Sequence, residues 1–158
     1  MLNDSQLNVQ IGALIEDFDF ETITKIVRPA TVARSWIRYQ QSTDLERSKS
    51  VYWWSYWLMK EIPDRSDGSL FMKTLKILVD IAPDNQLADL AAAHFEDMLV
   101  GESEEIISWF ERRALESPRF RLAMRSMWLT SMSPQVAERI EVARQEPYGA
   151  GRSGTPDI

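Results

Sequence analysis

Residues 83–101 read PDNQLADLAAAHFEDMLVG, and this run carries the start and stop signals of one helix. Pro83, Asp84 and Asn85 supply capping residues at its start, and Gly101 suits the left-handed position that often follows a helix. Between these signals the apolar side chains recur every three or four residues and form one stripe, made of Leu87, Leu90, Ala91, Phe95 and Met98. The spacing predicts a helix over about residues 86–99.

The same periodicity recurs on both sides of this helix. Apolar spacing, with a proline at several helix starts, predicts further helices over about residues 4–15, 29–41, 50–62, 70–81, 103–116, 119–130 and 134–145. The acidic run at residues 16–21 is interpreted as a junction. Alternating β-branched runs accompanied by turn dipeptides, the combination that indicates strands, are missing from the sequence. We therefore expect an all-α fold.

The length of 158 residues is that of one ordinary domain. We expect about eight short helices to form a single domain over residues 1–146, as an irregular bundle or a small solenoid-like array. Residues 147–158 are dominated by Gly, Pro and polar side chains, so we expect a disordered tail there.

The composition excludes several kinds of chemistry. The chain has no Cys and one His, which removes thiolate metal sites, disulfides and cysteine nucleophiles. The single histidine, His94, falls inside the apolar stripe of its helix and is interpreted as a core imidazole. Asp17, Asp19 and Glu21 alternate as calcium ligands do, but the turn glycine and the distal glutamate of a calcium loop are missing. No phosphate loop, nucleophile elbow or zinc-protease motif is present either. We expect no enzymatic activity, no cofactor and no metal.

The N-terminal sequence has no basic region followed by an apolar run, and no apolar stretch reaches the roughly 18–20 residues of a membrane span. These features predict a cytoplasmic protein without a membrane partner.

Negative charge is concentrated in one part of the chain. The net charge is −6, and residues 77–111 contain nine acidic and no basic side chains. Such a block repels the phosphates of a nucleic acid and attracts a basic protein, so we expect no direct binding of nucleic acid. Helical wheels put the acids on the solvent side of two neighbouring helices, and the candidate partner-binding residues are Asp89, Glu96, Glu104, Glu105 and Glu111. The alternative is an ordinary solvated face.

Five aromatic residues fall within residues 52–57, YWWSYW. On a helical wheel, Trp54 lies on the most aliphatic face and is expected to be buried. Trp53 and Trp57 share another face, and they are candidate binding residues because exposed Trp is enriched in binding hot spots. The alternative is a helix buried on all sides in the middle of the domain.

Residues 90–99, LAAAHFEDML, resemble the LAAGPLEDLL signature of a bacterial domain family of unknown function. Other residues that resemble landmarks of this family are Trp36, Ile37, Trp54, Phe120, Met127 and Trp128, so the resemblance covers about residues 33–131. The sequence departs from the signature at Ala93 and His94, where the family has Gly-Pro. The resemblance implies a helical bacterial domain and assigns no activity.

These observations favour a non-enzymatic, acidic protein-binding module. The function expected first is that of an immunity or inhibitor protein that neutralises a basic protein partner such as a toxin. One alternative is an adaptor or structural subunit that docks through its Trp-rich helix. The other is a phage-encoded inhibitor of a nucleic-acid-handling complex.

Overall fold

The computed structural model describes residues 4–17, 19–47, 49–62, 66, 68–101 and 103–145, and the predicted tail lies outside them. Within the described residues the chain forms ten helices, if the contiguous segments over residues 84–99 are counted as one, and no strand. Nine of the ten have seven or more residues. The all-α prediction is therefore confirmed. None of the helices described is both long and apolar enough to cross a membrane.

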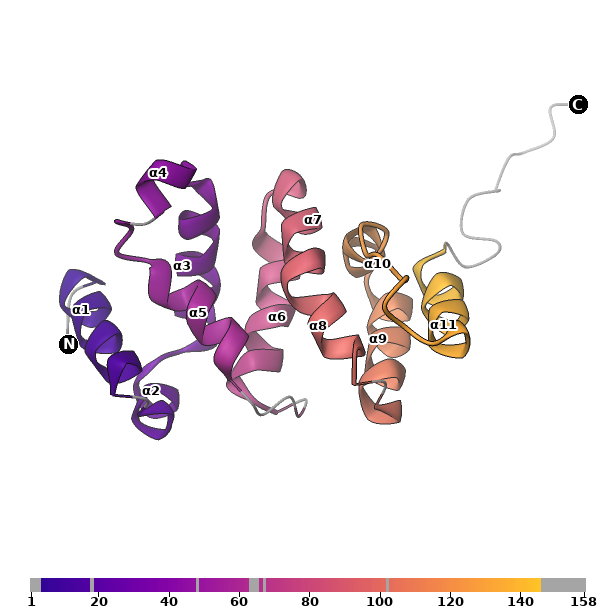
Figure 1. Ribbon diagram of the computed structural model, residues 1–158, viewed down its shortest axis with the longest axis horizontal. Helices are drawn as coiled ribbons and strands as arrows, with labels where there is room; N and C mark the ends of the chain where they lie inside the picture. The colour runs from indigo at the N-terminus through magenta and orange to yellow at the C-terminus, as the bar shows by residue number, and fades with distance from the viewer. Residues whose placement is uncertain are drawn as a thin grey trace, which may run out of the picture. The chain divides into compact units, whose positions relative to one another are not determined.

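The helices divide into two compact units, unit 1 at Met1–Gln86 and unit 2 at Leu87–Ile158, both within Figure 1. Unit 1 contains α1 (Asp4–Glu16), α2 (Phe20–Ile26), α3 (Pro29–Gln41), α4 (Asp44–Arg47), α5 (Trp53–Glu61), α6 (Leu70–Ile81) and the short η1 (Asp84–Gln86). Unit 2 contains α7 (Leu87–Leu90), η2 (Ala91–Phe95), α8 (Glu96–Leu99), α9 (Glu104–Glu116), α10 (Pro118–Met124) and α11 (Pro134–Arg144).

Helix α3 lies at the centre of unit 1, where it packs against both α5 and α6, while α1 packs against α2 and α5. Pro29 begins α3 at a position where its missing N–H costs nothing. Trp36 of α3 and Trp54 of α5 are both fully buried, which confirms the expected burial of Trp54. The indole Nε1 of Trp54 donates to Asn8 Oδ1 at 2.8 Å and so ties α5 to α1.

In unit 2, α7, η2 and α8 form one continuous helix, and α9 packs against both α10 and α11 (Figure 1). The core of this unit is a cluster of buried aromatic rings. The Phe95 ring centroid lies 4.8 Å from that of Phe120 and 5.0 Å from that of Phe110, and Trp109 lies 5.4 Å from Phe120. The apolar stripe that predicted the helix at residues 86–99 is the face that packs on this cluster.

The helices differ from the sequence prediction at several places: α4 was not predicted, and α5 begins at Trp53 where the prediction began at residue 50. Two further differences have a physical reason that the structure shows. Residues 16–21 are not only a junction, because α2 begins within them at Phe20, where Asp19 Oδ1 accepts a hydrogen bond from Thr22 N at 3.1 Å. The helix predicted at residues 119–130 ends at Met124. There Arg144 of α11 donates to the carbonyls of Met124 and Met127, at 3.5 and 3.2 Å, which satisfies acceptors that a longer helix would use.

Candidate functional site

The acidic residues singled out in the sequence all lie in unit 2, on the α7–η2–α8 helix and on α9. Asp89, Glu104 and Glu105 are exposed, and Glu96 and Glu111 are half-buried. Their use by a partner stays a prediction, but the structure shows that they do not form one uniformly free acidic patch.

Arg139 of α11 binds two of these acids at once. Its Nη1 and Nη2 donate to the two carboxylate oxygens of Glu104 at 2.7 and 2.9 Å, and its Nε and Nη2 donate to those of Glu111 at 2.8 Å each. The hydrogen bond from Arg139, followed by one from Ser108, lowers the pKa of Glu104 to about 2. The hydrogen bonds to Glu111 and then to Glu104 raise the pKa of Arg139 above its ordinary value. We call this arrangement the Arg139 clamp.

The clamp corrects the expected charge of this surface. The helical wheel placed Glu104 and Glu111 on the solvent side of α9, and Arg139 reaches them there because α11 packs against α9. Arg139 is 28 residues beyond Glu111 in the sequence, outside the acidic block, so the periodicity of α9 alone does not reveal it. The one guanidinium cancels one of the two carboxylate charges. Of the other candidate acids, Asp89 and Glu105 are exposed and lie outside the clamp. Glu96 binds the backbone N–H of Trp128.

Glu96 holds a loop that presents Trp128. The carboxylate Oε1 of Glu96 accepts a hydrogen bond from the backbone N–H of Trp128 at 2.8 Å. Met127, the preceding residue, is buried, whereas the Trp128 side chain is 71% exposed. The carboxylate and the buried methionine therefore fix the backbone of a loop whose indole stands in solvent.

Sequence reasoning did not single out Trp128 as a binding residue. Residues 119–130 were expected to form one helix, and Trp128 served only as a landmark of the family resemblance. The helix ends before it for reasons of tertiary packing, so the exposure of its ring could not be read from the local pattern.

The tryptophans predicted for binding lie in unit 1 and are partly covered. The Trp57 ring stacks on Phe20 with a centroid distance of 5.7 Å and an interplanar angle of 6°. Trp53 is 36% exposed, and its ring lies over Gly12 of α1, where an added Cβ would be 3.8 Å from Cζ2. Both rings thus contribute to packing within unit 1, and their role in binding stays a prediction.

The helix at residues 87–99 contains one wide turn. Residues Ala91–Phe95 adopt π-helical geometry, which is rare and inserts one extra residue into an α-helix. His94 lies in this turn and is 99% buried, as the core interpretation predicts. The turn coincides with the AAAHF part of the signature, where the sequence has Ala93 and His94 in place of Gly-Pro.

Comparison with known proteins identifies the family and no activity. The chain belongs to a family of unknown function, DUF6869, whose pattern matches residues 41–148. This match confirms the expected membership of an uncharacterised helical family, and it includes the signature at residues 90–99. No curated protein and no solved structure matches the chain significantly.

Proposed function

We propose that the chain is a protein-binding module that holds a basic segment of a partner protein on unit 2. The observation that carries the proposal is the 71% exposed Trp128 in a loop fixed by Glu96. Tryptophan supplies a large contact area with few rotatable bonds, and it is among the residues most enriched in binding hot spots. A ring on an ordered backbone also loses little freedom on binding.

The surroundings of the ring favour a cationic ligand group. Glu96 can accept hydrogen bonds from a partner's Lys or Arg, and an exposed indole can bind the same cation by a cation–π contact. Val100, one turn after Glu96, is 58% exposed and adds apolar area. We call Trp128, Glu96 and Val100 the Trp128 surface. Asp89, exposed two turns before Glu96, extends the negative charge along the helix.

The biological role that we propose is neutralisation of a basic partner, as an immunity or inhibitor protein neutralises a toxin. The nine acids and absent bases of residues 77–111 support this role, since such a field accelerates encounter with a basic surface. A phage-encoded inhibitor of a nucleic-acid-handling complex would use the same chemistry on a different partner. Docking through the Trp-rich helix has less support, because Trp57 stacks on Phe20 and Trp53 covers Gly12.

The proposal is tested by site-specific photo-crosslinking in the cells that produce the protein. A photoreactive phenylalanine analogue replaces Trp128 in one variant, and in the control it replaces Leu115, which is 75% exposed on α9 of the same unit. We expect one basic protein to crosslink from position 128 and not from position 115. Crosslinks to the same set of proteins from both positions would contradict the proposal.

The isolated partner then gives the quantitative test. Replacing a hot-spot tryptophan by alanine weakens binding by at least about 2 kcal/mol, so Trp128→Ala should raise Kd about 30-fold or more. An unchanged Kd would show that the crosslink reports proximity and not binding.

A further inference from the structure

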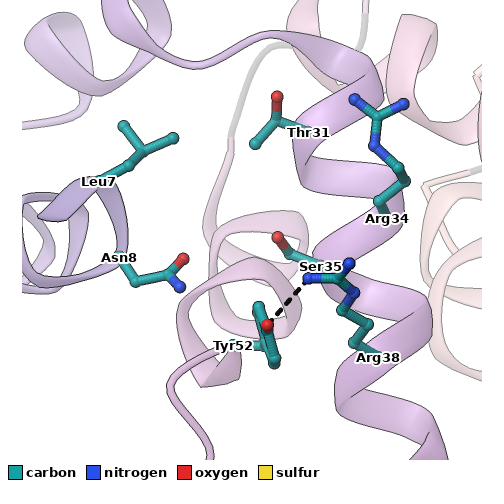
Figure 2. Close-up of a pocket in the computed structure, with 7 residues that line it drawn as sticks. All are labelled: Leu7, Asn8, Thr31, Arg34, Ser35, Arg38 and Tyr52. Carbon is teal, nitrogen blue, oxygen red and sulfur yellow. Dashed lines mark hydrogen bonds between the residues drawn. The ribbon is translucent and has the colours of Figure 1, made fainter. Parts of the chain in front are cut away.

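Unit 1 contains a small polar cavity that the proposed function does not use. It lies between α1, α3 and the start of α5 and has a volume of about 120 Å³ (Figure 2). The described residues that line it are Leu7, Asn8, Thr31, Arg34, Ser35, Arg38 and Tyr52. Pockets for drug-sized ligands measure roughly 300–1,000 Å³, so this cavity suits a ligand no larger than a small ion or a single functional group.

Two arginines of one helix line this cavity; in Figure 2 the Arg38 guanidinium lies beside Tyr52, and the Arg34 guanidinium extends away from both. Arg34 and Arg38 are one turn apart on α3 and carry like charges, an arrangement that destabilises a helix slightly when no anion is near. Arg38 is held in place by Tyr52: its Nη1 donates to Tyr52 Oη at 2.9 Å, and its guanidinium carbon lies 5.4 Å from the centre of the Tyr52 ring (Figure 2). One of the two cations is therefore preorganised.

The other polar groups of the cavity are also able to donate hydrogen bonds. Ser35 is 94% buried, and its hydroxyl oxygen points from α3 toward the cavity in Figure 2. Asn8 accepts from Trp54 Nε1 through its Oδ1, which leaves its amide N–H groups for the cavity. A hydroxyl group at the wall of the cavity can donate a hydrogen bond to an oxygen of a bound anion.

The described lining residues offer positive charge and hydrogen-bond donors and no negative charge. They include two permanent positive charges and several donors, and no carboxylate, in a chain whose net charge is −6. Guanidinium groups bind phosphate oxygens by paired, charge-assisted hydrogen bonds, and arginine is the preferred residue for this purpose. A tetrahedral oxyanion offers acceptors in several directions, which matches donors that come from α1, α3 and Tyr52.

We propose that this cavity is a binding site for a phosphate group, supplied as inorganic phosphate or as the phosphate monoester of a small molecule. The Arg34 and Arg38 side chains bind its oxygens, Tyr52 positions Arg38, and Ser35 and Asn8 donate from the wall of the cavity. The site is independent of the Trp128 surface, so each proposal can fail without the other.

Isothermal titration calorimetry of the full chain tests this site with inorganic phosphate and glycerol 3-phosphate, each at constant ionic strength. We expect one saturable site per chain for at least one of these ligands. The ligand with the lower Kd identifies the source of the phosphate group. If neither binds with saturation at millimolar concentration, the proposal is wrong.

Variants then locate the binding. Because a hydrogen bond to a charged group contributes more than a neutral one, Arg34→Gln and Arg38→Gln should each raise Kd about tenfold or more. Arg28→Gln, at the exposed N-cap of the same helix, removes the same charge outside the cavity and should change Kd less than twofold. An equal loss in all three variants would show diffuse attraction and overturn the proposal.

Ser35→Ala keeps the proposal testable if an arginine variant unfolds. It removes only the hydroxyl group that points toward the cavity, so the thermal midpoint without ligand should change little, while Kd for the phosphate ligand rises about threefold or more. Unchanged binding in Ser35→Ala and in a folded arginine variant would place the anion outside the cavity.

Discussion

The packing of unit 1 predicts a large difference between two adjacent tryptophans. Trp54 is fully buried and donates to Asn8 at 2.8 Å, whereas Trp53 is 36% exposed over Gly12. Trp54→Ala removes a ring from a packed interior and leaves the Asn8 carbonyl oxygen without its donor. Trp53→Ala removes the same atoms from a position that water already reaches, so the two substitutions form a matched pair.

The cost of Trp54→Ala is expected to be about 3–5 kcal/mol, the range measured when a large aromatic side chain is removed from a core. The lost hydrogen bond contributes about 1 kcal/mol of this, and more if the Asn8 oxygen stays shielded from water. Trp53→Ala should cost clearly less than Trp54→Ala, since a partly exposed ring leaves little cavity behind. Trp54→Phe is intermediate, because it keeps most of the ring and loses the N–H donor.

The assay is urea unfolding followed by far-ultraviolet circular dichroism, with the free energy of unfolding obtained by linear extrapolation. A double-mutant cycle of Trp54→Phe with Asn8→Ala isolates the hydrogen bond and should give a coupling free energy of about 1 kcal/mol. Equal losses of stability for Trp53→Ala and Trp54→Ala would refute the packing argument. A coupling near zero would refute the role of the hydrogen bond alone.

Two further predictions concern unit 2 and a helix cap. Arg139→Gln should restore the pKa of Glu104 from about 2 toward 4.5. A carboxylate whose folded pKa is depressed stabilises the fold above its unfolded pKa. In urea unfolding, the free energy of unfolding of the wild type should therefore exceed that of the variant by the full amount above pH 4.5, and this difference should vanish as the pH falls toward 2. A difference that does not depend on pH would contradict the clamp. At the start of α6, Ser69 Oγ accepts a hydrogen bond from Met72 N at 3.1 Å, so Ser69→Ala should lower the stability measured by thermal unfolding by about 1 kcal/mol. The control Ser103→Ala removes no cap hydrogen bond at α9 and should lower it less. Equal losses would show that the Ser69 cap is unimportant.

The helices that the sequence predicted well are those whose signals are local. The helix predicted from the apolar stripe between Leu70 and Ile81 is α6, and the structure adds Ser69 as its N-cap. The helix predicted at residues 29–41 is α3, which an apolar stripe and Pro29 at its first turn specify. Burial of Trp54 and His94 followed from their positions on one face of a helix.

The features that sequence reasoning missed depend on residues far apart in the chain. At the end of α10 the Met124 carbonyl accepts from Arg144, twenty residues further along the chain, and Trp128 lies in the loop that follows this end. The Arg139 clamp joins α11 to α9 across 28 and 35 residues. The periodicity of one helix says which face is polar, but not which charged side chain of another helix will pack there.

The clamp also decides how the acidic surface should be tested. Reversing Glu104 and Glu111 to lysine would place two cations beside Arg139 and disturb the packing of α9 and α11 together with the surface charge. Asp89 and Glu105 are exposed and outside the clamp, so reversal at these two positions changes the surface charge and leaves the Arg139 hydrogen bonds in place.

The most direct test of the central claim is the rate of association between this chain and its partner, measured by stopped-flow fluorescence at low salt. The double reversal Asp89→Lys with Glu105→Lys should lower the association rate tenfold or more, because charge steering acts on encounter. The control Glu138→Lys reverses an exposed charge on α11 outside the acidic block, and it should lower the association rate less. Trp128→Ala should mainly raise the dissociation rate. If the double reversal and Trp128→Ala both leave the two rates unchanged, unit 2 does not bind the partner through these residues and the proposed function is wrong.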